Sequence, residues 1–415
     1  MRKTLLQQLS DLKKNKAISL HVPGHKNNTI GNLNILNITH DKTEIQGLDN
    51  LHEPEGVLKD LNNFISQKYI NYTAQIMTNG STTGILAAIL AYKDSVNRYI
   101  IMNNAHKSVH HGIDLAGHNP VITNAINDII LEPNDVIIIT YPTYEGETID
   151  INTMIQHVHN NEAHIIIDEA HGSHFDITPN FPKSSMNHDA DVVIQSYHKM
   201  LPALTMGSVI FTKTNNKNLQ RNILKYINYI ETSSPSYLVM ASIESAHDFY
   251  LNYTDESFFI RRQQIINTLQ DARCTVKPQD DPTKLLITHS NHTVYDLEQA
   301  LTNNHIYPEM TTEDGVLIIL PLSHKDDSYP YALLNERLSS LNFTPTDKKA
   351  HDEFYLLMNK VCIQHIIPYP PGVPLVRKGD EITEEDIKRL IHLSKNRVKI
   401  EGVMGNIEYY TDRER

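Results

Sequence analysis

Short apolar runs alternate with helix-like segments between residues 70 and 231, and this alternation limits the fold more than any other feature of the chain. The predicted strands cover residues 75–78, 99–103, 135–140, 164–168, 191–195 and 207–211. Strands that alternate with helices form a mainly parallel sheet, because each helix carries the chain back across one face. The sequence therefore predicts an α/β large domain with helices on both faces of its sheet.

The spacing of the predicted elements changes near residue 271 and indicates a smaller α+β domain there. One long helix is expected over 236–270, as a bridge out of the large domain. The predicted organisation is an N-terminal arm with a substrate loop (1–70), a large domain (71–270), a small α+β domain (271–345) and a C-terminal segment (346–415).

The C-terminal segment contains a proline-rich stretch. Four of the seven residues in 368–374 are prolines, which exclude a helix or a central strand there. A helix is expected before it, over 349–363. The tail after Gly402 is expected to be loosely held.

Composition and charge exclude several classes of protein. The net charge of −12 disfavours a nucleic-acid partner, since phosphate contacts need clustered lysine and arginine. The two cysteines, Cys274 and Cys362, form neither a metal-binding spacing nor a disulfide framework, and no metal is expected. The N-terminus does not have the pattern of a secretory signal, and no run approaches the roughly 18 apolar residues of a membrane helix. We expect a cytoplasmic protein with no membrane partner.

The first candidate site is a turn of small residues after strand 75–78. Gly80, Ser81 and Thr82 begin a helix there. Free N–H groups and the helix dipole make such a turn a seat for a phosphate group. A plain connection from strand to helix is an equally good explanation of the turn taken alone.

A histidine and an aspartate follow two other strands. His106 comes shortly after strand 99–103, where a structural histidine is the ordinary explanation. Asp168 ends the apolar run 165–167. A carboxylate at the end of a buried strand needs a cation or a hydrogen-bond donor beside it. In doubly wound sheets, ligands bind at these carboxyl ends.

The fourth candidate is Lys199, which follows the apolar run 192–194. Burial and a cationic neighbour both lower the pKa of a lysine, and an amine that attacks an aldehyde must lose its proton. Ser196 and His198 flank this lysine with a hydroxyl and an imidazole, two groups suited to a phosphate.

These candidates occur in the order of a pyridoxal phosphate (PLP) site. A phosphate seat at Gly80 is followed by His106, which could stack on a ring, and then by Asp168 and Lys199. Asp168 would keep the pyridine nitrogen protonated, so that the ring accepts electrons, and Lys199 would bind the aldehyde.

A helicase is the rival explanation, since residues 168–171 spell Asp-Glu-Ala-His. A helicase with this box also needs a glycine-rich loop that ends in Gly-Lys to hold nucleotide phosphates. The chain contains no Gly-Lys dipeptide, which excludes the helicase.

Over residues 20 to about 395 the chain resembles the Orn/Lys/Arg decarboxylases, which are PLP enzymes of the aspartate aminotransferase fold (fold type I). The matching motifs are Pro23-Gly24-His25-Lys26, Thr43-Glu44, Leu48-Asp49, Asn79-Gly80-Ser81-Thr82, His106-Lys107-Ser108, Asp168-Glu169-Ala170-His171-Gly172, Ser196-x-His198-Lys199 and Pro368-Tyr369-Pro370-Pro371-Gly372-Val373-Pro374. The resemblance implies a mainly parallel seven-stranded sheet in the large domain.

The resemblance also implies a role for each site residue. Lys199 would be the Schiff-base lysine, Asp168 the partner of the ring nitrogen and His106 the imidazole stacked on the ring. The remaining cofactor-binding residues would be Gly80, Ser81, Thr82, Ser196 and His198 at the phosphate, with Ala170 and His171 as the opposite wall.

The activity implied by the resemblance is decarboxylation of arginine, lysine or ornithine to the corresponding amine and CO₂, in a homodimer whose subunits share their active sites. The distal cation of such a substrate needs an acceptor, because an unpaired buried charge is costly. Candidate substrate residues are His25, Glu44, Asp49, Glu53 and Glu55. About 20 residues precede His21, so the chain resembles the short family members without an N-terminal wing domain.

Two alternatives remain at this point. Another reaction on the same fold, transamination or a lyase reaction such as β-elimination, would use the same lysine and aspartate. A non-catalytic PLP-binding protein is the more distant alternative, and the complete set of His106, Asp168 and Lys199 argues against it.

Overall fold

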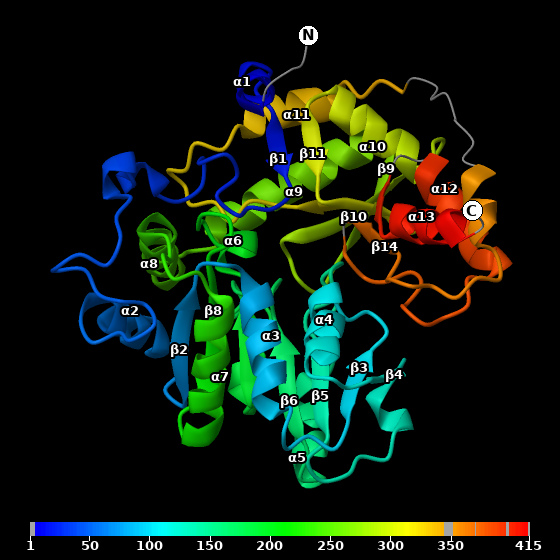
Figure 1. The fold of residues 1–415 in the computed structure, drawn as a ribbon. Coiled ribbons are helices and arrows are strands. Elements are labelled where there is room, and N and C mark those ends of the chain that lie inside the picture. Colours follow the sequence, from blue (N-terminus) through cyan, green and yellow to red (C-terminus); the bar gives the residue numbers. More distant parts are fainter. Residues whose placement is uncertain (1–4, 344–351, 370, 396–397, 414–415) are drawn as a thin grey trace. The chain divides into compact units, whose positions relative to one another are not determined.

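The structure is a computed structural model that describes residues 5–343, 352–369, 371–395 and 398–413 of the 415-residue chain. The chain forms two compact units, Met1–Asn103 with Ser108–Asn342 and Asn104–Lys107 with Phe343–Arg415 (Figure 1). The division into four segments stays a prediction, and its boundary between residues 345 and 346 lies outside the described residues.

A seven-stranded sheet forms the centre of the larger unit. Its order is β2-β8-β7-β6-β5-β3-β4. Neighbouring strands from β7 to β4 run parallel, whereas β8 runs antiparallel to both β7 and β2. The strands are β2 (Tyr72–Met77), β3 (Tyr99–Met102), β4 (Val121–Thr123), β5 (Val136–Thr140), β6 (His164–Asp168), β7 (Val192–Gln195) and β8 (Ser208–Lys213). The predicted mainly parallel seven-stranded sheet is confirmed.

The central strands are apolar along their whole length because both of their faces are covered. Residues 136–139, 165–167 and 192–194 are all buried, as is typical of parallel strands between two helix layers.

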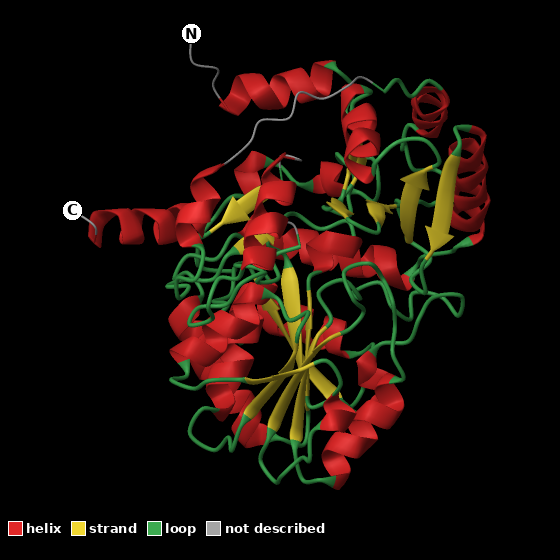
Figure 2. Cartoon of the chain, turned by 90° about the vertical axis from the view of Figure 1, so that its right-hand side faces the viewer, coloured by secondary structure: helices red, strands yellow, loops and turns green. Residues whose placement is uncertain are grey.

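Figure 2 shows helices on both sides of the sheet. On one face, α3 (Ser81–Tyr92) and α7 (Lys217–Ile230) pack against each other and contact β8. The helix α5 (Ile151–Asn160) contacts β6. Further helices in this part of the chain are α1 (Leu5–Lys14), α2 (Val57–Ser66), α4 (Lys107–Leu115) and α6 (Tyr197–Met200).

The prediction of one long helix over 236–270 is wrong, because the structure has two helices there. They are α8 (Tyr237–Leu251) and α9 (Glu256–Asp271). Asn252 caps the end of α8 with its backbone N–H. The connecting residues are Asn, Tyr, Thr and Asp, and three of these types favour caps and turns over helix interiors. The buried Tyr253 then fixes the turn between the two helices.

A smaller antiparallel sheet follows in the same unit, with the order β12-β13-β10-β9. Its strands are β9 (Cys274–Pro278), β10 (Lys284–His289), β12 (Met310–Thr312) and β13 (Gly315–Ile319), and the helices nearby in the chain are α10 (Val294–Asn303) and α11 (Tyr331–Ser339). The N-terminal strand β1 (Ile18–Leu20) pairs in parallel with β11 (Ile306–Pro308). This pairing attaches the N-terminal segment to the α+β part of the chain.

Two predictions for the C-terminal unit are wrong. The helix expected over 349–363 is only a short 3₁₀ helix, Asp352–Leu357, and residues 349–351 lie outside the described part of the chain. The tail after Gly402 is not loosely held, because it forms α13 (Val403–Arg413) and buries Val403 and Ile407 in an apolar cluster.

The proline-rich stretch contains no helix among its described residues. Its first residues belong to β14 (Ile367–Tyr369), which pairs with β15 (Lys399–Glu401) in a two-stranded sheet, so the proline lies in an edge strand. Pro370 is outside the described residues. The helix α12 (Glu384–Lys395) completes this unit.

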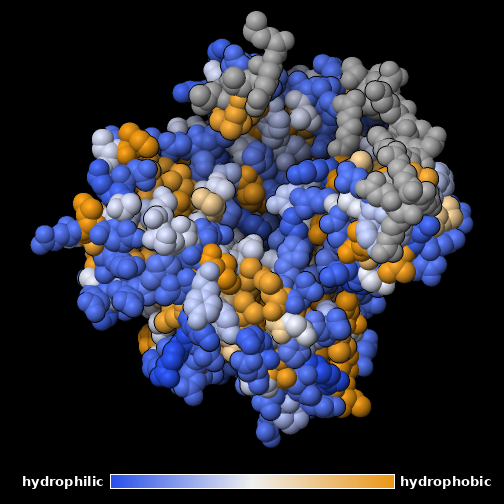
Figure 3. Space-filling view, viewed as in Figure 1, coloured by the Kyte–Doolittle hydropathy of each residue, from blue (hydrophilic) through white to orange (hydrophobic). Residues whose placement is uncertain are grey.

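On the face shown in Figure 3, hydrophilic side chains are interspersed with apolar patches. Among the described residues, none of the helices combines the length and the apolar character that a membrane crossing requires.

Candidate active site

Lys199 and Asp168 lie at the same edge of the large sheet. Asp168 is the last residue of β6, and Lys199 lies in the short helix α6 that directly follows β7. The two strands are parallel neighbours, and Asp168 is aligned with Ile194. Adjacent parallel strands end at the same edge, which brings the carboxylate and the amine together.

Lys199 is partly buried beside an imidazole. Its Nζ lies 3.1 Å from Nε2 of His171. Burial lowers the pKa of Lys199, while the charges of Asp168 and Glu309 act in the opposite direction. A lysine with a lowered pKa is a better nucleophile near neutral pH than an exposed one.

Asp168 is almost fully buried, at 3% exposure. Burial raises the pKa of its carboxyl, whereas the charge of Lys199 and the backbone N–H of Ala170 lower it. That N–H donates to Oδ1 over 3.2 Å. The carboxylate therefore needs a positive partner to stay ionised in this apolar place.

The next residue, Glu169, is fully buried and has a structural role. Its oxygens accept hydrogen bonds from Ser184 Oγ (2.7 Å), from Ser185 N (2.9 Å) and Oγ (2.6 Å), and from Gln195 Nε2 (2.6 Å). Burial raises its pKa to about 7. These bonds occupy the carboxylate, and they tie the segment after β6 to β7.

The predicted phosphate seat lies at the start of α3. Gly80 caps this helix with φ of 82°, and a side chain built at Gly80 would meet nothing within 4 Å, so an anion can approach the backbone there. The first N–H groups of a helix have no acceptor within it. Ser196 Oγ donates to Ser81 Oγ over 2.8 Å, which joins this turn to the residues just before Lys199.

His198 belongs to the same short helix as Lys199. Its Nδ1–H donates to the carbonyl of Gly207 over 3.0 Å. Burial lowers the pKa of His198 to about 4, against the opposing effect of that carbonyl. The backbone N–H of Gly24 donates to the carbonyl of His198 over 2.8 Å. A side chain at Gly24 would meet the carbonyl oxygen of Leu201 at 2.6 Å, so only glycine allows this close approach.

The N-terminal segment brings another buried amine close to the site. Lys26 is 2% exposed and its Nζ donates to the carbonyl of His21 over 2.6 Å. Burial lowers the pKa of Lys26 to about 7, although the charge of Glu309 raises it. His25 accepts a hydrogen bond at Nδ1 from the N–H of Asn28 over 2.9 Å, so one of its nitrogens has a local use.

Glu309 was missed in the sequence, and its charge acts on three lysine amines. It follows β11 directly, and its Oε2 accepts from the N–H of Val22 over 2.8 Å. Its charge raises the pKa values of Lys26, Lys199 and Lys284. The three-residue strand before it is too short to be recognised from a periodic pattern.

Of the acidic loop, Asp49 has a clear local role. Its carboxylate accepts from the backbone N–H groups of Glu55 (3.0 Å), Gly56 (2.7 Å) and Leu58 (3.2 Å) at the start of α2. Slight burial raises the pKa of Asp49, but these N–H groups lower it below its usual value. Glu44 is exposed. The parts of Asp49, Glu44 and His25 in substrate binding stay predictions.

His106 belongs to the C-terminal unit, together with residues 104–107. A side chain at Gly372 would meet its Nε2 at 2.9 Å, and the next residue, Lys107, pairs with Glu401 at 2.6 Å. The stacking of His106 on a cofactor ring stays a prediction. Among the described residues, no group of three or more His, Cys, Asp or Glu could hold a metal ion.

A large, mainly parallel sheet that carries a lysine and a buried aspartate at one edge defines an enzyme of the fold type I class. The model of the major domain of Orn/Lys/Arg decarboxylases matches residues 4–130 and 122–282. The chain belongs to the Orn/Lys/Arg decarboxylase family and is an amino-acid decarboxylase.

Relatives and solved structures agree with this assignment. The uncharacterized protein YaaO of Bacillus subtilis (strain 168) is 30% identical over 93% of each chain. The arginine decarboxylase of Halalkalibacterium halodurans is 25% identical over 94% of this chain and 93% of its own. The constitutive lysine decarboxylase of E. coli superposes with a TM-score of 0.63 and 16% identity, over 83% of this chain and 71% of its own, and shows the shared fold.

The residues at the sheet edge fit PLP, the cofactor inferred from the family. The open space beside Gly80 and the N-terminus of α3 suit a phosphate. The amine of Lys199 suits an aldehyde, and the Asp168 carboxylate suits a protonated ring nitrogen.

Proposed function

We propose that the protein decarboxylates a basic amino acid, namely arginine, lysine or ornithine, to the corresponding amine and CO₂ with PLP. The observation that carries the proposal is the meeting of Lys199 and Asp168 at the carboxyl edge of the sheet. Four relatives carry the name arginine decarboxylase, which makes arginine the first substrate to test.

Bound PLP would supply the sink for the electrons of the breaking bond between Cα and the carboxylate. Lys199 is the amine that would hold the cofactor. Asp168, kept from solvent, would hold a proton on the ring nitrogen. The start of α3 would bind the phosphate together with Ser81, Thr82, Ser196 and His198, and so fix the orientation of the ring.

Proton transfer is assigned to Lys199 and His171. The contact of 3.1 Å between Nζ and Nε2 lets the two groups share one proton, and burial favours the neutral form of the amine. The pair can therefore deliver a proton to the substrate carbon once the carboxylate has left. Ala170 and His171 would form one wall of the cofactor site.

The distal cation of the substrate is assigned to Glu309. Its negative charge acts on the amines of Lys26 and Lys199, so it would also act on a cation bound beside them. A carboxylate can serve arginine as a two-point partner and lysine or ornithine as a point charge. Glu309→Gln is expected to raise KM for basic amino acids more than it lowers kcat.

A homodimer with shared active sites is part of the proposal. The phosphate-seat residue Thr82 and the acidic residue Glu44 are both exposed in the single chain, so a second subunit could cover them. Light scattering of the full-length chain tests the dimer. A monomeric species that turns over substrate at the full rate would contradict shared sites.

The decisive experiment is a product assay with the PLP-loaded chain and each of the three amino acids. We expect CO₂ and the matching amine, and a visible absorbance band from the lysine-bound cofactor. The Lys199→Ala variant should lose both the band and the activity. A keto acid without CO₂ would show transamination and overturn the proposal, and an unchanged band in the variant would overturn the assignment of Lys199.

A further inference from the structure

Three buried ionisable side chains form a cluster that the proposed chemistry does not use. Nε2 of His174 lies 2.9 Å from Oδ1 of Asp281, and Nζ of Lys284 lies 3.8 Å from Oδ2 of the same carboxylate. All three side chains are fully buried. His174 follows β6 by six residues, whereas Lys284 begins β10 and Asp281 lies three residues before it, so the cluster joins the two sheets of the larger unit.

Such a cluster is a poor source of stability. Removing charges from water costs free energy that their mutual attraction often only offsets, and apolar side chains of similar volume commonly serve as well. What a buried ionic cluster does provide is a single defined geometry. Its function should therefore be sought in what it holds in place.

One connection runs from His174 to His171 through the chain. The N–H of Gly172 donates to the carbonyl of Glu169 over 2.9 Å, and the N–H of Phe175 donates to that of Gly172 over 2.9 Å. These two consecutive turns leave little freedom between residues 169 and 175. Fixing the His174 ring on Asp281 therefore fixes His171, whose Nε2 meets the amine of Lys199.

A second connection reaches His171 from another loop. Nζ of Lys284 donates to the carbonyl of Thr143 over 3.3 Å, and the N–H of Asp281 donates to the carbonyl of Gly146 over 2.9 Å. Between these two anchors lies Tyr144, which packs its ring edge-on against His171 with centroids 5.2 Å apart. The cluster thus holds the imidazole from both sides.

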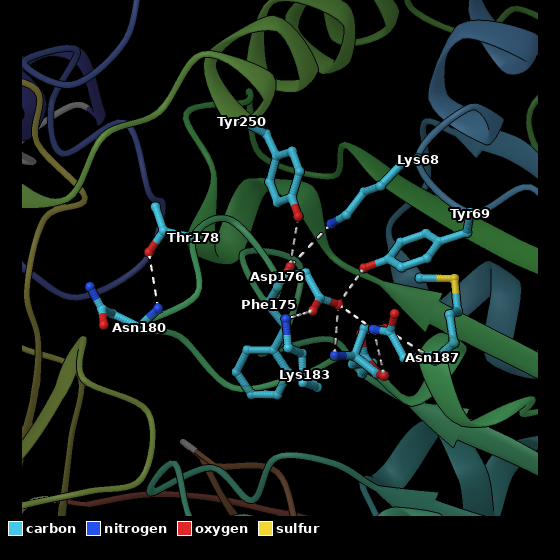
Figure 4. Close-up of polar contacts among 12 residues, drawn as sticks. Lys68, Tyr69, Phe175, Asp176, Thr178, Asn180, Lys183, Asn187 and Tyr250 are labelled. Atoms are coloured by element: carbon cyan, nitrogen blue, oxygen red, sulfur yellow. Dashed lines mark hydrogen bonds and ion pairs between the residues drawn. The ribbon is translucent and has the colours of Figure 1, made fainter.

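The far end of the loop after β6 has its own anchor. The Asp176 carboxylate accepts from Tyr69 (3.0 Å) and Asn187 (2.6 Å) and pairs with Lys183 at 3.1 Å (Figure 4). Lys68 donates to the carbonyl of Phe175 over 3.1 Å. Loss of the His174 contact should therefore loosen the stretch around His171 without unfolding the loop.

We propose that His174, Asp281 and Lys284 are positioning residues that hold His171 and Tyr144 in place against Lys199. The inference rests on the proposed function, since the aligned groups are those assigned to cofactor binding and proton transfer. The cluster makes the geometry of the cofactor site depend on the α+β part of the chain.

The test compares four variants of the full-length chain with the wild type. Asp281→Leu with Lys284→Met removes both charges and keeps the volume, so stability should be largely retained. His174→Gln keeps an N–H donor toward Asp281 and should rescue most of the behaviour that His174→Leu loses. Asp191→Asn is the matched control, because Asp191 also pairs with a histidine (His159, 3.2 Å), but at the start of β7.

The readouts are the dissociation constant of PLP and the pH at which the visible cofactor band changes. Loss of groups that orient metal ligands commonly costs about 10- to 100-fold in metal affinity, and by analogy we expect a loss of this size in PLP affinity for the double variant and for His174→Leu. In these two variants, the visible cofactor band should change at a different pH from that of the wild type. Asp191→Asn and His174→Gln should stay within about threefold of the wild type.

Thermal unfolding and circular dichroism show whether each variant is folded. The proposal is overturned if the folded double variant binds PLP as the wild type does, or if Asp191→Asn loses affinity to the same extent. It is also overturned if His174→Gln and His174→Leu behave alike. A wild-type chain that shows no cofactor band would instead overturn the proposed function, so the two failures are distinguishable.

Discussion

Two clusters that each join a histidine, an aspartate and a lysine lie at opposite edges of the large sheet. At the amino edge, Asp191 lies 3.2 Å from His159 and 3.3 Å from Lys213. At the carboxyl edge, Asp281 lies 2.9 Å from His174 and 3.8 Å from Lys284. The first cluster is partly open to solvent, with side-chain exposures of 13 to 29%, whereas the second is fully closed.

The difference in exposure indicates that the two clusters have different roles. The backbone N–H of Ile165 donates to Asp191 over 2.9 Å, and the open cluster is partly exposed, so its ionic groups join strand ends at little cost. The closed cluster carries the full cost of desolvation. Such a cost is expected where geometry matters for a site, and the closed cluster is the one whose loops reach His171.

The lysines give the largest expected contrast between the two edges. Lys199→Ala should lower turnover by more than about 10³-fold, the scale of removing a covalent or proton-transferring group, and should abolish the visible cofactor band. Lys213→Ala removes two ion pairs at the amino edge and should leave kcat within about twofold, since it touches nothing at the carboxyl edge. Steady-state assays and absorbance spectra of both variants check this. Equal losses of turnover in the two variants would contradict a catalytic role that is specific to the carboxyl edge.

The histidines give the next contrast. His171→Phe keeps an aromatic ring against Tyr144 but removes the nitrogen beside Lys199, and should lower kcat by about 10- to 100-fold with KM nearly unchanged. His159→Phe at the amino edge should leave both constants within about twofold. Kinetics over a range of substrate concentrations measure kcat and KM separately. A normal kcat in His171→Phe would remove this imidazole from proton transfer.

The contrast between edges also explains what the sequence could predict. The regularly spaced apolar runs predicted the parallel sheet. The ends of two of these runs predicted Asp168 and Lys199 as site residues, because a polar residue after an apolar run stands out. Glu309, Tyr144 and the Asp281 cluster carry no such signal. They come from short strands and loops, and their meeting depends on tertiary packing between segments more than 100 residues apart, as for His174 and Asp281.

Local details were hidden for a related reason. The break between α8 and α9 depends on a cap at Asn252 within an otherwise apolar helical pattern. The helix after Gly402 is stabilised by burying Val403 and Ile407, which their own sequence does not reveal. The local role of Asp49 is visible only in the structure, where its carboxylate accepts from the N–H groups of Glu55 and Gly56 just before α2.

Low pH should reduce the contribution of both clusters to the free energy of unfolding, and the reduction should be larger for the closed cluster. Burial raises the pKa of Asp281, but His174, Lys284 and Thr283 lower it more strongly, to about 2, compared with 3.8 for an ordinary aspartate. A carboxyl with a depressed folded-state pKa stabilises the fold above its unfolded pKa and loses that contribution as pH falls through the folded one. The contribution is about 2 kcal/mol and should vanish between about pH 4 and pH 2.

The pKa of Asp191 is also lowered, so its carboxylate too should stabilise the fold at neutral pH and lose that contribution in acid. Denaturant unfolding of Asp281→Asn, Asp191→Asn and the wild type at about pH 6 and about pH 3 measures both contributions. The stability gap between wild type and Asp281→Asn should narrow at the lower pH. A gap that stays constant would mean that Asp281 is not the depressed carboxyl.

The smallest expected effect is the coupling free energy between the two clusters. A small value would show that the two clusters act independently. The five residues of β6 separate the edges by roughly 16 Å. Substitutions so far apart should add, so that Asp281→Asn with Asp191→Asn deviates from additivity by less than about 0.5 kcal/mol in the free energy of unfolding. Within the closed cluster, Asp281→Asn with His174→Gln shares one hydrogen bond and should deviate by about 0.5–3 kcal/mol. Double-mutant cycles measure both values. Strong coupling between the edges would show that the sheet transmits strain from the amino edge to the site, and the two clusters could then no longer be assigned separate roles.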